Sequence, residues 1–217
     1  MNYKELKKDK EIKAYIQKGN EKLGAMGYTD HSEKHCILVA ERAGMILKKF
    51  DYPEHTIELA KMAGFLHDGN SVNRCHHAEY GALLANEWMK KTNITMEDRI
   101  TIMSAIASHD ESTGGAFDPV SAALILADKT DVRRNRVRDK EKAAYDMHDR
   151  VNYAVTESRL KISHSKKQIS LNLQIDESIC TMYEYFDIFL QRMQMCRRAA
   201  GILDARFRLT ANGSKIL

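Results

Sequence analysis

Histidine and aspartate residues are the groups of this chain whose types and spacing could do chemistry. The sequence holds nine histidines, and His67 and Asp68 directly follow the apolar run that ends at Leu66. Asp128 follows a second apolar run, residues 122–127. A charged group beside a buried apolar helix is costly unless it has a partner. Several such groups meeting in one core therefore predict a divalent metal ion, and the mixture of imidazole and carboxylate favours Fe, Mn, Co, Ni or Zn.

An ordered series of short motifs contains these groups. The motifs are His-x-x-x-Val-Ala from His35, Phe-Leu-His-Asp-Gly around His67, His-x-x-x-Gly-Ala from His77, and Leu-Ala-Asp-Lys around Asp128, with His109 between the last two. The series resembles the HD-domain superfamily of metal-dependent phosphohydrolases, and the resemblance covers residues 29–138. A single His-Asp pair would be weak support. His148-Asp149 is such a pair outside the series, and we interpret it as a chance occurrence with a solvated aspartate.

The resemblance implies a set of metal ligands. In it, His35, His67, Asp68 and Asp128 hold one ion, while His77 and His109 look like the added ligands of the two-metal branch, in which Asp68 bridges both ions. Two ions roughly 3.5–4 Å apart can activate a nucleophile and clamp a phosphoryl oxygen. A one-metal site, with His77 and His109 as ordinary buried residues, is the alternative.

Residues near these motifs are candidates for contact with a substrate. A basic run at 129–142 carries seven basic and three acidic residues, and its first part could neutralise phosphate charge, whereas most of 136–142 is expected to be a solvated face. Asp131 could orient a ligand or the attacking water. His31, one turn before His35 on the same face, is expected on the substrate side. The candidate catalytic residues are Asp68, Lys129 and Asp131, and the candidate substrate contacts are His31, Asn70, Arg74, Lys129, Arg133 and Arg134.

The predicted function is hydrolysis of a phosphoester or phosphoanhydride in a nucleotide or another small phosphorylated compound. The ligand order is closest to that of bacterial symmetric diadenosine tetraphosphate hydrolases. HD-fold mixed-valent diiron oxygenases, which act on a small polyol or phosphonate, share that order and are the first alternative. The basic run favours hydrolysis, because a neutral polyol has no use for it. The second alternative is a regulatory module that binds a nucleotide without turnover.

Helices must position these residues. Apolar residues at helical spacing predict helices over 37–50, 57–66, 78–90, 96–108 and 120–133, with Gly114-Gly115 and Asp118-Pro119 in the loop before the last. Residues 169–175 alternate between apolar and polar, which predicts a half-buried strand. A helix over 179–193 follows, and Asn212-Gly213 predicts a terminal hairpin. The expected fold is mainly α, with a helical HD-type domain over 1–150 and a small antiparallel β appendage, a strand–helix–hairpin unit, over 151–217.

The composition agrees with one domain and an appendage. The 217 residues are 43% hydrophobic and 29% charged, which excludes wholesale disorder. No apolar run reaches the roughly 18 residues of a membrane span, and the lysine-rich N-terminus lacks the apolar core of a signal peptide, so a soluble, cytoplasmic protein is expected. The four cysteines lack Cys-x-x-Cys spacing and are expected to be reduced. The basic run has no interleaved aromatic residues, which argues against nucleic acid as a partner. A homodimer is left open.

Overall fold

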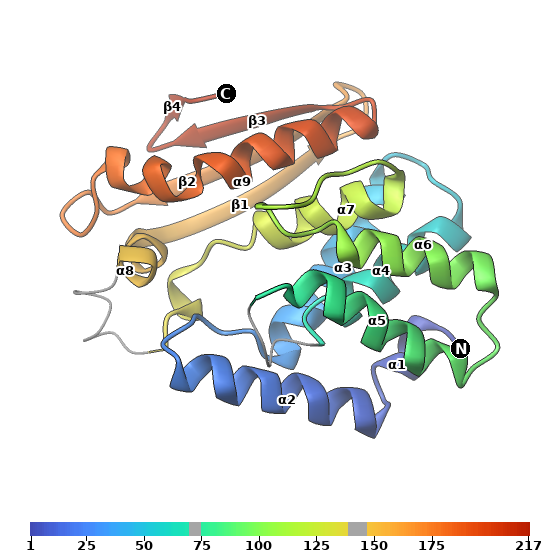
Figure 1. Cartoon of the computed structure of the whole chain (residues 1–217). Coiled ribbons are helices and arrows are strands. Elements are labelled where there is room, and N and C mark those ends of the chain that lie inside the picture. Colours follow the sequence, from blue (N-terminus) through green and yellow to red (C-terminus); the bar gives the residue numbers. More distant parts are fainter. Residues whose placement is uncertain (70–74, 139–146) are drawn as a thin grey trace.

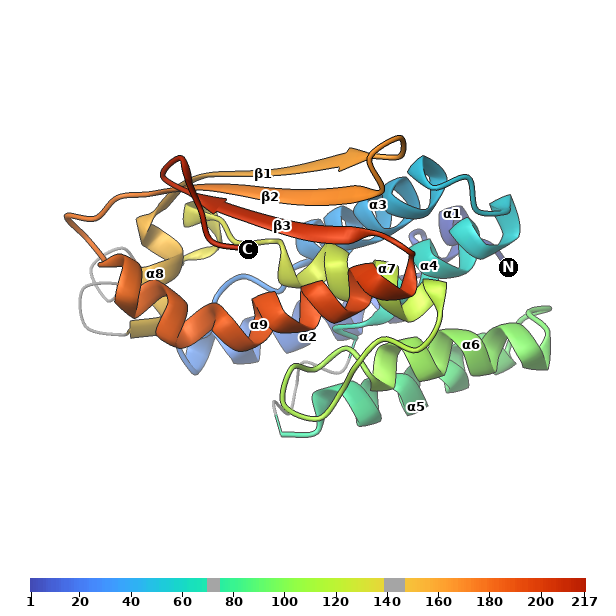
Figure 2. The same ribbon diagram turned by 90° about the horizontal axis from the view of Figure 1, so that it is seen from above.

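The computed structural model describes residues 1–69, 75–138 and 147–217 (Figure 1). A helical body lies beneath a small C-terminal sheet, and a long helix runs alongside that sheet (Figures 1 and 2). The helices of the body are α1 (Tyr3–Leu6), α2 (Lys10–Ala25), α3 (Glu33–Lys49), α4 (Glu54–Leu66), α5 (His77–Lys90), α6 (Met96–Ala107) and α7 (Pro119–Lys129). The mainly helical class predicted for the chain is therefore confirmed.

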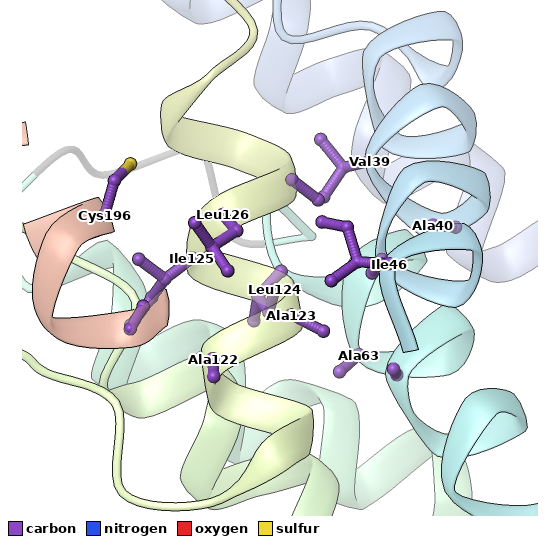
Figure 3. Packing of buried hydrophobic residues seen from close by; sticks show 14 of the residues in the cluster. Val39, Ala40, Ile46, Ala63, Ala122, Ala123, Leu124, Ile125, Leu126 and Cys196 are labelled. Carbon is purple, nitrogen blue, oxygen red and sulfur yellow. The ribbon is translucent and has the colours of Figure 1, made fainter. Parts of the chain in front are cut away.

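Helix α7 lies at the centre of the molecule. It contacts α3, α4 and α6 in the body and also α9 (Met182–Ile202) from the C-terminal part. All six residues of its apolar run, 122–127, are fully buried, which explains why no polar side chain interrupts that run. Figure 3 shows Ile125 on the side of α9, where Cys196 lies, and Ala123 on the side of α3 and α4.

The start of α7 follows the prediction, but its end does not. The Asp118 carboxylate accepts from the Ser121 amide at 2.7 Å, and Pro119 occupies the first turn, as expected for a helix N-terminus. The prediction that the helix continues to Arg133 is wrong, because α7 ends at Lys129. The Thr130 hydroxyl donates to the carbonyl of Leu126 and the Asp131 amide to that of Asp128, which closes a turn. A short 3₁₀ helix, η1 (Arg134–Arg136), comes next.

The C-terminal part contains α8 (Met147–Ala154), β1 (Val155–Ser163), β2 (Gln168–Ile175), α9, β3 (Arg206–Ala211) and β4 (Ser214–Lys215). The strand order is β1-β2-β3-β4. The prediction of an antiparallel sheet is wrong in one respect, because β2 and β3 are parallel while the other neighbours are antiparallel. The physical reason is α9, which carries the chain back along the sheet, so that β3 starts at the same end as β2.

The predicted strand and hairpin are both confirmed. Ile169, Leu171, Leu173 and Ile175 are buried on β2, and the polar residues between them are more exposed. Asn212 (φ 48°) and Gly213 (φ 80°) adopt the left-handed backbone that a tight turn between β3 and β4 requires. The sequence analysis missed β1, an edge strand in which Leu160 and Ile162 are only partly buried and the charged Lys161 lies between them.

One continuous apolar cluster contains residues from the body and from the C-terminal part, so the predicted ranges 1–150 and 151–217 share a core. None of the four cysteines forms a disulfide within the described part of the chain, and Cys36, Cys180 and Cys196 are buried in that core. Among the described helices, none combines the length and the apolar character needed to cross a lipid bilayer.

Candidate metal centre

The six predicted metal ligands lie at the ends of five helices, α3 to α7, and these ends converge. His35 is in the first turn of α3, and His67 and Asp68 directly follow α4. His77 begins α5, His109 follows the end of α6, and Asp128 is in the last turn of α7. All are buried except Asp128, whose side chain is 12% exposed. Five sequence segments therefore bring their polar ends to one point inside an apolar body.

A close contact between α3 and α4 makes this convergence possible. A Cβ atom on Gly64 would lie 2.7 Å from Cα of Ala40, closer than packed atoms can approach. Glycine at this position lets the backbones of the two helices touch, as in other close helix packings. His67 is one turn after Gly64, and its ring centroid lies 5.3 Å from that of His35. The glycine thus brings the predicted ligands that follow α4 next to the predicted ligand in α3.

The donor atoms of five of the six residues form two overlapping groups, each compact enough to hold an ion. Asp68 Oδ2 lies 3.5 Å from His35 Nε2 and 3.2 Å from His67 Nε2. Asp128 Oδ1 lies 3.3 Å and 3.7 Å from the same two nitrogens. Two groups have all their donor atoms within 4.8 Å of one another, namely His35 with His67 and Asp128, and His67 with Asp68 and His109. The His77 and His109 ring centroids are 5.0 Å apart. The structure therefore brings all six predicted ligands together.

Hydrogen bonds on the outer side of the rings aim three imidazoles inward. In each of these rings, Nδ1 donates to an oxygen outside the cluster. His35 donates to Asp131 Oδ2 at 2.8 Å, His67 to the Gly64 carbonyl at 2.8 Å, and His109 to the Ile106 carbonyl at 2.6 Å. This leaves Nε2 as the available ligand atom, as in metal-bound histidines. Nε2 of His35 and of His67 is buried and makes no hydrogen bond to any described residue. Buried polar atoms need a partner, so these residues fit a divalent metal.

Electrostatics in the metal-free protein also suit a cation. Burial opposes a charge on His67, but the carboxylates of Asp68 and Asp128 outweigh it and raise the His67 pKa to about 10. Burial likewise opposes ionisation of Asp68 and Asp128, yet His67 beside the first and Lys129 beside the second hold both pKa values well below the usual range. Burial and then Lys129 lower the pKa of His109 to about 3. The centre thus contains two ionised carboxylates, which a divalent cation can bind.

Asp131 lies where the sequence predicts an orienting residue. It is buried behind His35 and is itself held by Arg133, whose Nη2 donates to Asp131 Oδ2 at 3.0 Å. Arg136 is buried, and its guanidinium group donates to the Asp131 carbonyl at 3.0 Å and to the Asp30 carbonyl at 2.8 Å. The prediction of a solvated face is therefore wrong for Arg136, whose charge holds the turn behind His35 to the loop before α3.

A cavity of about 470 Å³ opens onto the cluster, a size in the roughly 300–1,000 Å³ range of small-molecule sites. Its walls come from the loop before α3, the metal cluster, the loop after α6, α8 and α9. The lining residues are Met26, Gly27, Tyr28, Thr29, His31, Asp68, His77, His109, Glu111, Asp128, Lys129, Arg136, His148, Asp149, Asn152, Phe189 and Arg192. The C-terminal part of the chain therefore forms one side of the cavity.

The predicted substrate contacts divide into three groups. Lys129 and His31 line the cavity, and His31 lies just before α3, which starts after Ser32. Among the described residues, the lining does not include Arg133, which pairs with Asp131, or Arg134, which lies 4.6 Å over the Tyr153 ring and donates to the Tyr153 carbonyl. Both departures follow from the early end of α7. Asn70 and Arg74 lie outside the described residues, as do residues 139–142 of the basic run.

Sequence reasoning missed several residues of the cavity. Asp149, interpreted as a solvated aspartate, is 7% exposed and lines the cavity with Asn152, so that interpretation is wrong. Their spacing of three residues, which places both on one face of a short helix, was the available signal. Glu111 and Arg192 were also missed, and their Oε1 and Nε atoms are 2.7 Å apart. Burial opposes ionisation of Glu111, but Lys129 and Arg192 hold its pKa well below its usual range.

Comparison with known proteins shows which family has a sequence similar to this chain. The model of the HD domain family matches residues 33–147, which is more than half of the chain and includes all six predicted ligands. The chain belongs to the HD-domain family. HD domains bind divalent metals and are generally metal-dependent phosphohydrolases.

One curated relative is also similar to this HD-domain chain. It is an uncharacterized protein of Methanocaldococcus jannaschii, 30% identical over 173 residues, and the match covers 68% of this chain and 66% of the relative. The chain thus spans slightly less than two thirds of that protein. No solved structure matches the chain.

Proposed function

We propose that this HD-domain protein hydrolyses a phosphoester or phosphoanhydride bond of a small phosphorylated compound, a nucleotide being the expected class, at a centre of two divalent metal ions. The observation that carries the proposal is the position of Lys129. Its ammonium group lies 2.9 Å from Oδ2 of Asp128, and both residues line the cavity onto which the imidazole cluster opens. A cation beside a metal centre matches the charge of a phosphate group, whereas an uncharged polyol has no need for it.

The donor set supports two ions. His35, His67, Asp68 and Asp128 would hold the first, and His77 and His109, with Asp68 shared, would hold the second. Bound divalent ions supply Lewis acidity and activate a water molecule near neutral pH without any serine or cysteine nucleophile. Asp131 keeps Nδ1 of His35 protonated, which fixes the tautomer whose Nε2 is a ligand. Lys129 is positioned to stabilise negative charge that develops on the phosphate.

The outer part of the cavity suggests how the substrate is oriented. Asp149 and Asn152 lie on one wall, formed by α8, and Phe189 lies on another. A carboxylate repels phosphate but accepts hydrogen bonds from hydroxyl and amino groups. We therefore place the phosphate at the metal centre and the organic part, with its hydroxyl groups and any ring, against α8 and Phe189. A nucleotide has both parts.

The test combines phosphate release with metal analysis. Wild-type protein loaded with Mn²⁺ is screened for phosphate release from nucleotides and simple phosphomonoesters, and its metal content is measured. We expect turnover with two ions per chain, loss of both activity and metal in Asp68→Ala, and about one ion per chain in His109→Ala. One ion in the wild type, unchanged in His109→Ala, would contradict the two-metal centre, and absence of phosphate release from every compound would contradict the hydrolase.

A further inference from the structure

Four charged side chains of alternating sign form a continuous row along one wall of the cavity. Nε of Arg192 lies 2.7 Å from Glu111 Oε1, and Nζ of Lys129 lies 2.7 Å from Glu111 Oε2. The same ammonium group lies 2.9 Å from Oδ2 of Asp128. Lys129 is only 4% exposed, so water screens its two ion pairs weakly. The row therefore runs from the C-terminal helix to the metal centre.

Three distant segments meet in this row, and packing holds them in place. Arg192 belongs to α9, Glu111 to the loop after α6, and Lys129 to the end of α7. Helix α9 packs along α7, as Figure 1 also shows. Helix α9 makes two contacts with Glu111. In addition to the Arg192 ion pair, the Gln191 side chain donates to the Glu111 carbonyl at 3.0 Å. The Arg192 guanidinium lies 4.9 Å over the ring of Phe189, which fixes its plane.

The charges of the row cancel, and that balance matters for an anion. Glu111 lines the same cavity as Lys129, so its carboxylate alone would repel a phosphate group and compete with it for the ammonium group. Arg192 neutralises this carboxylate while leaving it in contact with Lys129. The carboxylate can then hold the lysine side chain, whose four-carbon stem is otherwise flexible, without making the cavity negative.

We propose that Arg192 and Glu111 are positioning residues of the phosphate site: Glu111 holds the Lys129 ammonium group beside Asp128, and Arg192 cancels the charge of Glu111. The inference rests on the proposed function, because it takes phosphate to bind at Lys129. It gives the C-terminal part of the chain a role in the site, since α9 supplies the residue on which the charge balance depends.

Charge balance makes a specific prediction for paired substitutions. Arg192→Ala leaves Glu111 as an uncompensated anion, so phosphate affinity should fall and KM should rise, roughly tenfold to a hundredfold for one charge-assisted interaction. Adding Glu111→Gln to Arg192→Ala removes that anion but keeps a side-chain oxygen that can accept from the Lys129 ammonium group, so it should recover most of the loss. A purely structural role of Arg192 would give no recovery, because the second substitution removes a further contact. Arg192→Lys, which keeps the charge, should lie close to wild type.

The experiment measures binding of inorganic phosphate to Mn²⁺-loaded protein by calorimetry, with kcat and KM for a phosphomonoester and metal content in parallel. The matched control is Arg197→Ala, which changes an exposed arginine on the same helix and should bind phosphate like wild type.

Unchanged phosphate affinity in Arg192→Ala, or a double variant as weak as the single one, would overturn the proposal. If Arg192→Ala does not fold, Arg192→Lys and the double variant are compared with wild type. The proposal then requires both to bind phosphate nearly as well as wild type, and a large loss in either overturns it. Phosphate binding without turnover of any ester would refute the proposed hydrolase activity. The phosphate affinities of the variants would still test the role of Glu111 and Arg192.

Discussion

His67 and His109 are both buried imidazoles of the metal cluster, yet their pKa values move in opposite directions. Burial disfavours the charge on each, but Asp68 and Asp128 overcome it at His67, whose pKa rises to about 10. At His109 the charge of Lys129 adds to burial and lowers the pKa to about 3. In the metal-free protein at neutral pH, His67 therefore carries a proton and His109 is neutral.

Metal binding should consequently release a proton. A histidine must be neutral to bind a metal ion. In the metal-free fold, His67 keeps its proton up to a pH of about 10, whereas an ordinary histidine loses it near pH 6.5. Raising the pH across this range should increase the apparent metal affinity, by up to roughly tenfold per pH unit for one proton. Calorimetry of Mn²⁺ binding in two buffers of different ionisation enthalpy measures the proton. A metal affinity that stays constant across this pH range would contradict a protonated His67 that loses its proton to become a ligand.

Single residues also show what could be predicted from the sequence. Five of the six clustered histidines and aspartates lie in short local motifs, and His109 lies between two of these motifs, so their order along the chain was informative. Glu111 and Arg192 have no such motif, because their ion pair depends on how α9 packs against α7. Asp149 was misread because a dipeptide alone does not say which way a short helix faces. Local chemistry was therefore visible in the sequence, and contacts between distant elements were not.

At the scale of elements, the α3–α4 contact should determine both stability and the metal site. Gly64→Ala places a Cβ 2.7 Å from Cα of Ala40 and should destabilise the fold by roughly 1–3 kcal/mol, the usual effect of overpacking. Denaturant unfolding measures this. Gly201→Ala is the matched control, since a Cβ on this α9 glycine meets no described atom within 4 Å and alanine favours helix. Equal stability of the two variants would contradict the close contact.

Helix α8 should contribute to substrate binding but not to the metal centre. Asp149→Ala removes an acceptor from the cavity wall and should raise KM for a nucleotide or sugar phosphate by roughly tenfold, with metal content unchanged. Asp187→Ala, on the exposed side of α9, is the control and should have no effect on KM. Steady-state kinetics with metal analysis decide this. Loss of metal in Asp149→Ala would place that residue in the centre instead.

The boundaries of elements were predicted less well than their existence. Periodicity identified α3 to α7, β2 and α9, because each buries one continuous apolar face. It extended α7 to Arg133, since nothing in the local pattern shows that Thr130 turns back to Leu126. It also missed β1, whose polar and charged residues reflect an edge position, and it could not show that α9 makes β2 and β3 parallel neighbours. Pairing partners are a property of the assembled sheet, not of one strand.

At the scale of the whole molecule, the site lies between the helical body and the C-terminal part. The body supplies the six clustered donors, and α8 and α9 supply the opposite walls of the cavity. One apolar cluster joins both parts, so α9 is held firmly on α7. The metal centre and the residues proposed to recognise the organic part of the substrate therefore belong to one packed unit.

Metal exchange tests the central claim most directly, because an oxygenase and a hydrolase differ in what they need from the ion. Hydrolysis requires only Lewis acidity and an activated water, so redox-silent Zn²⁺ or Mn²⁺ should support it without oxygen. The measurement is phosphate release from nucleotides by Mn²⁺- and Zn²⁺-loaded protein under strictly anaerobic conditions. We predict turnover with at least one of these ions and none in Asp68→Ala. Strict dependence of activity on iron and dioxygen, with no phosphate released from any nucleotide, would contradict the account.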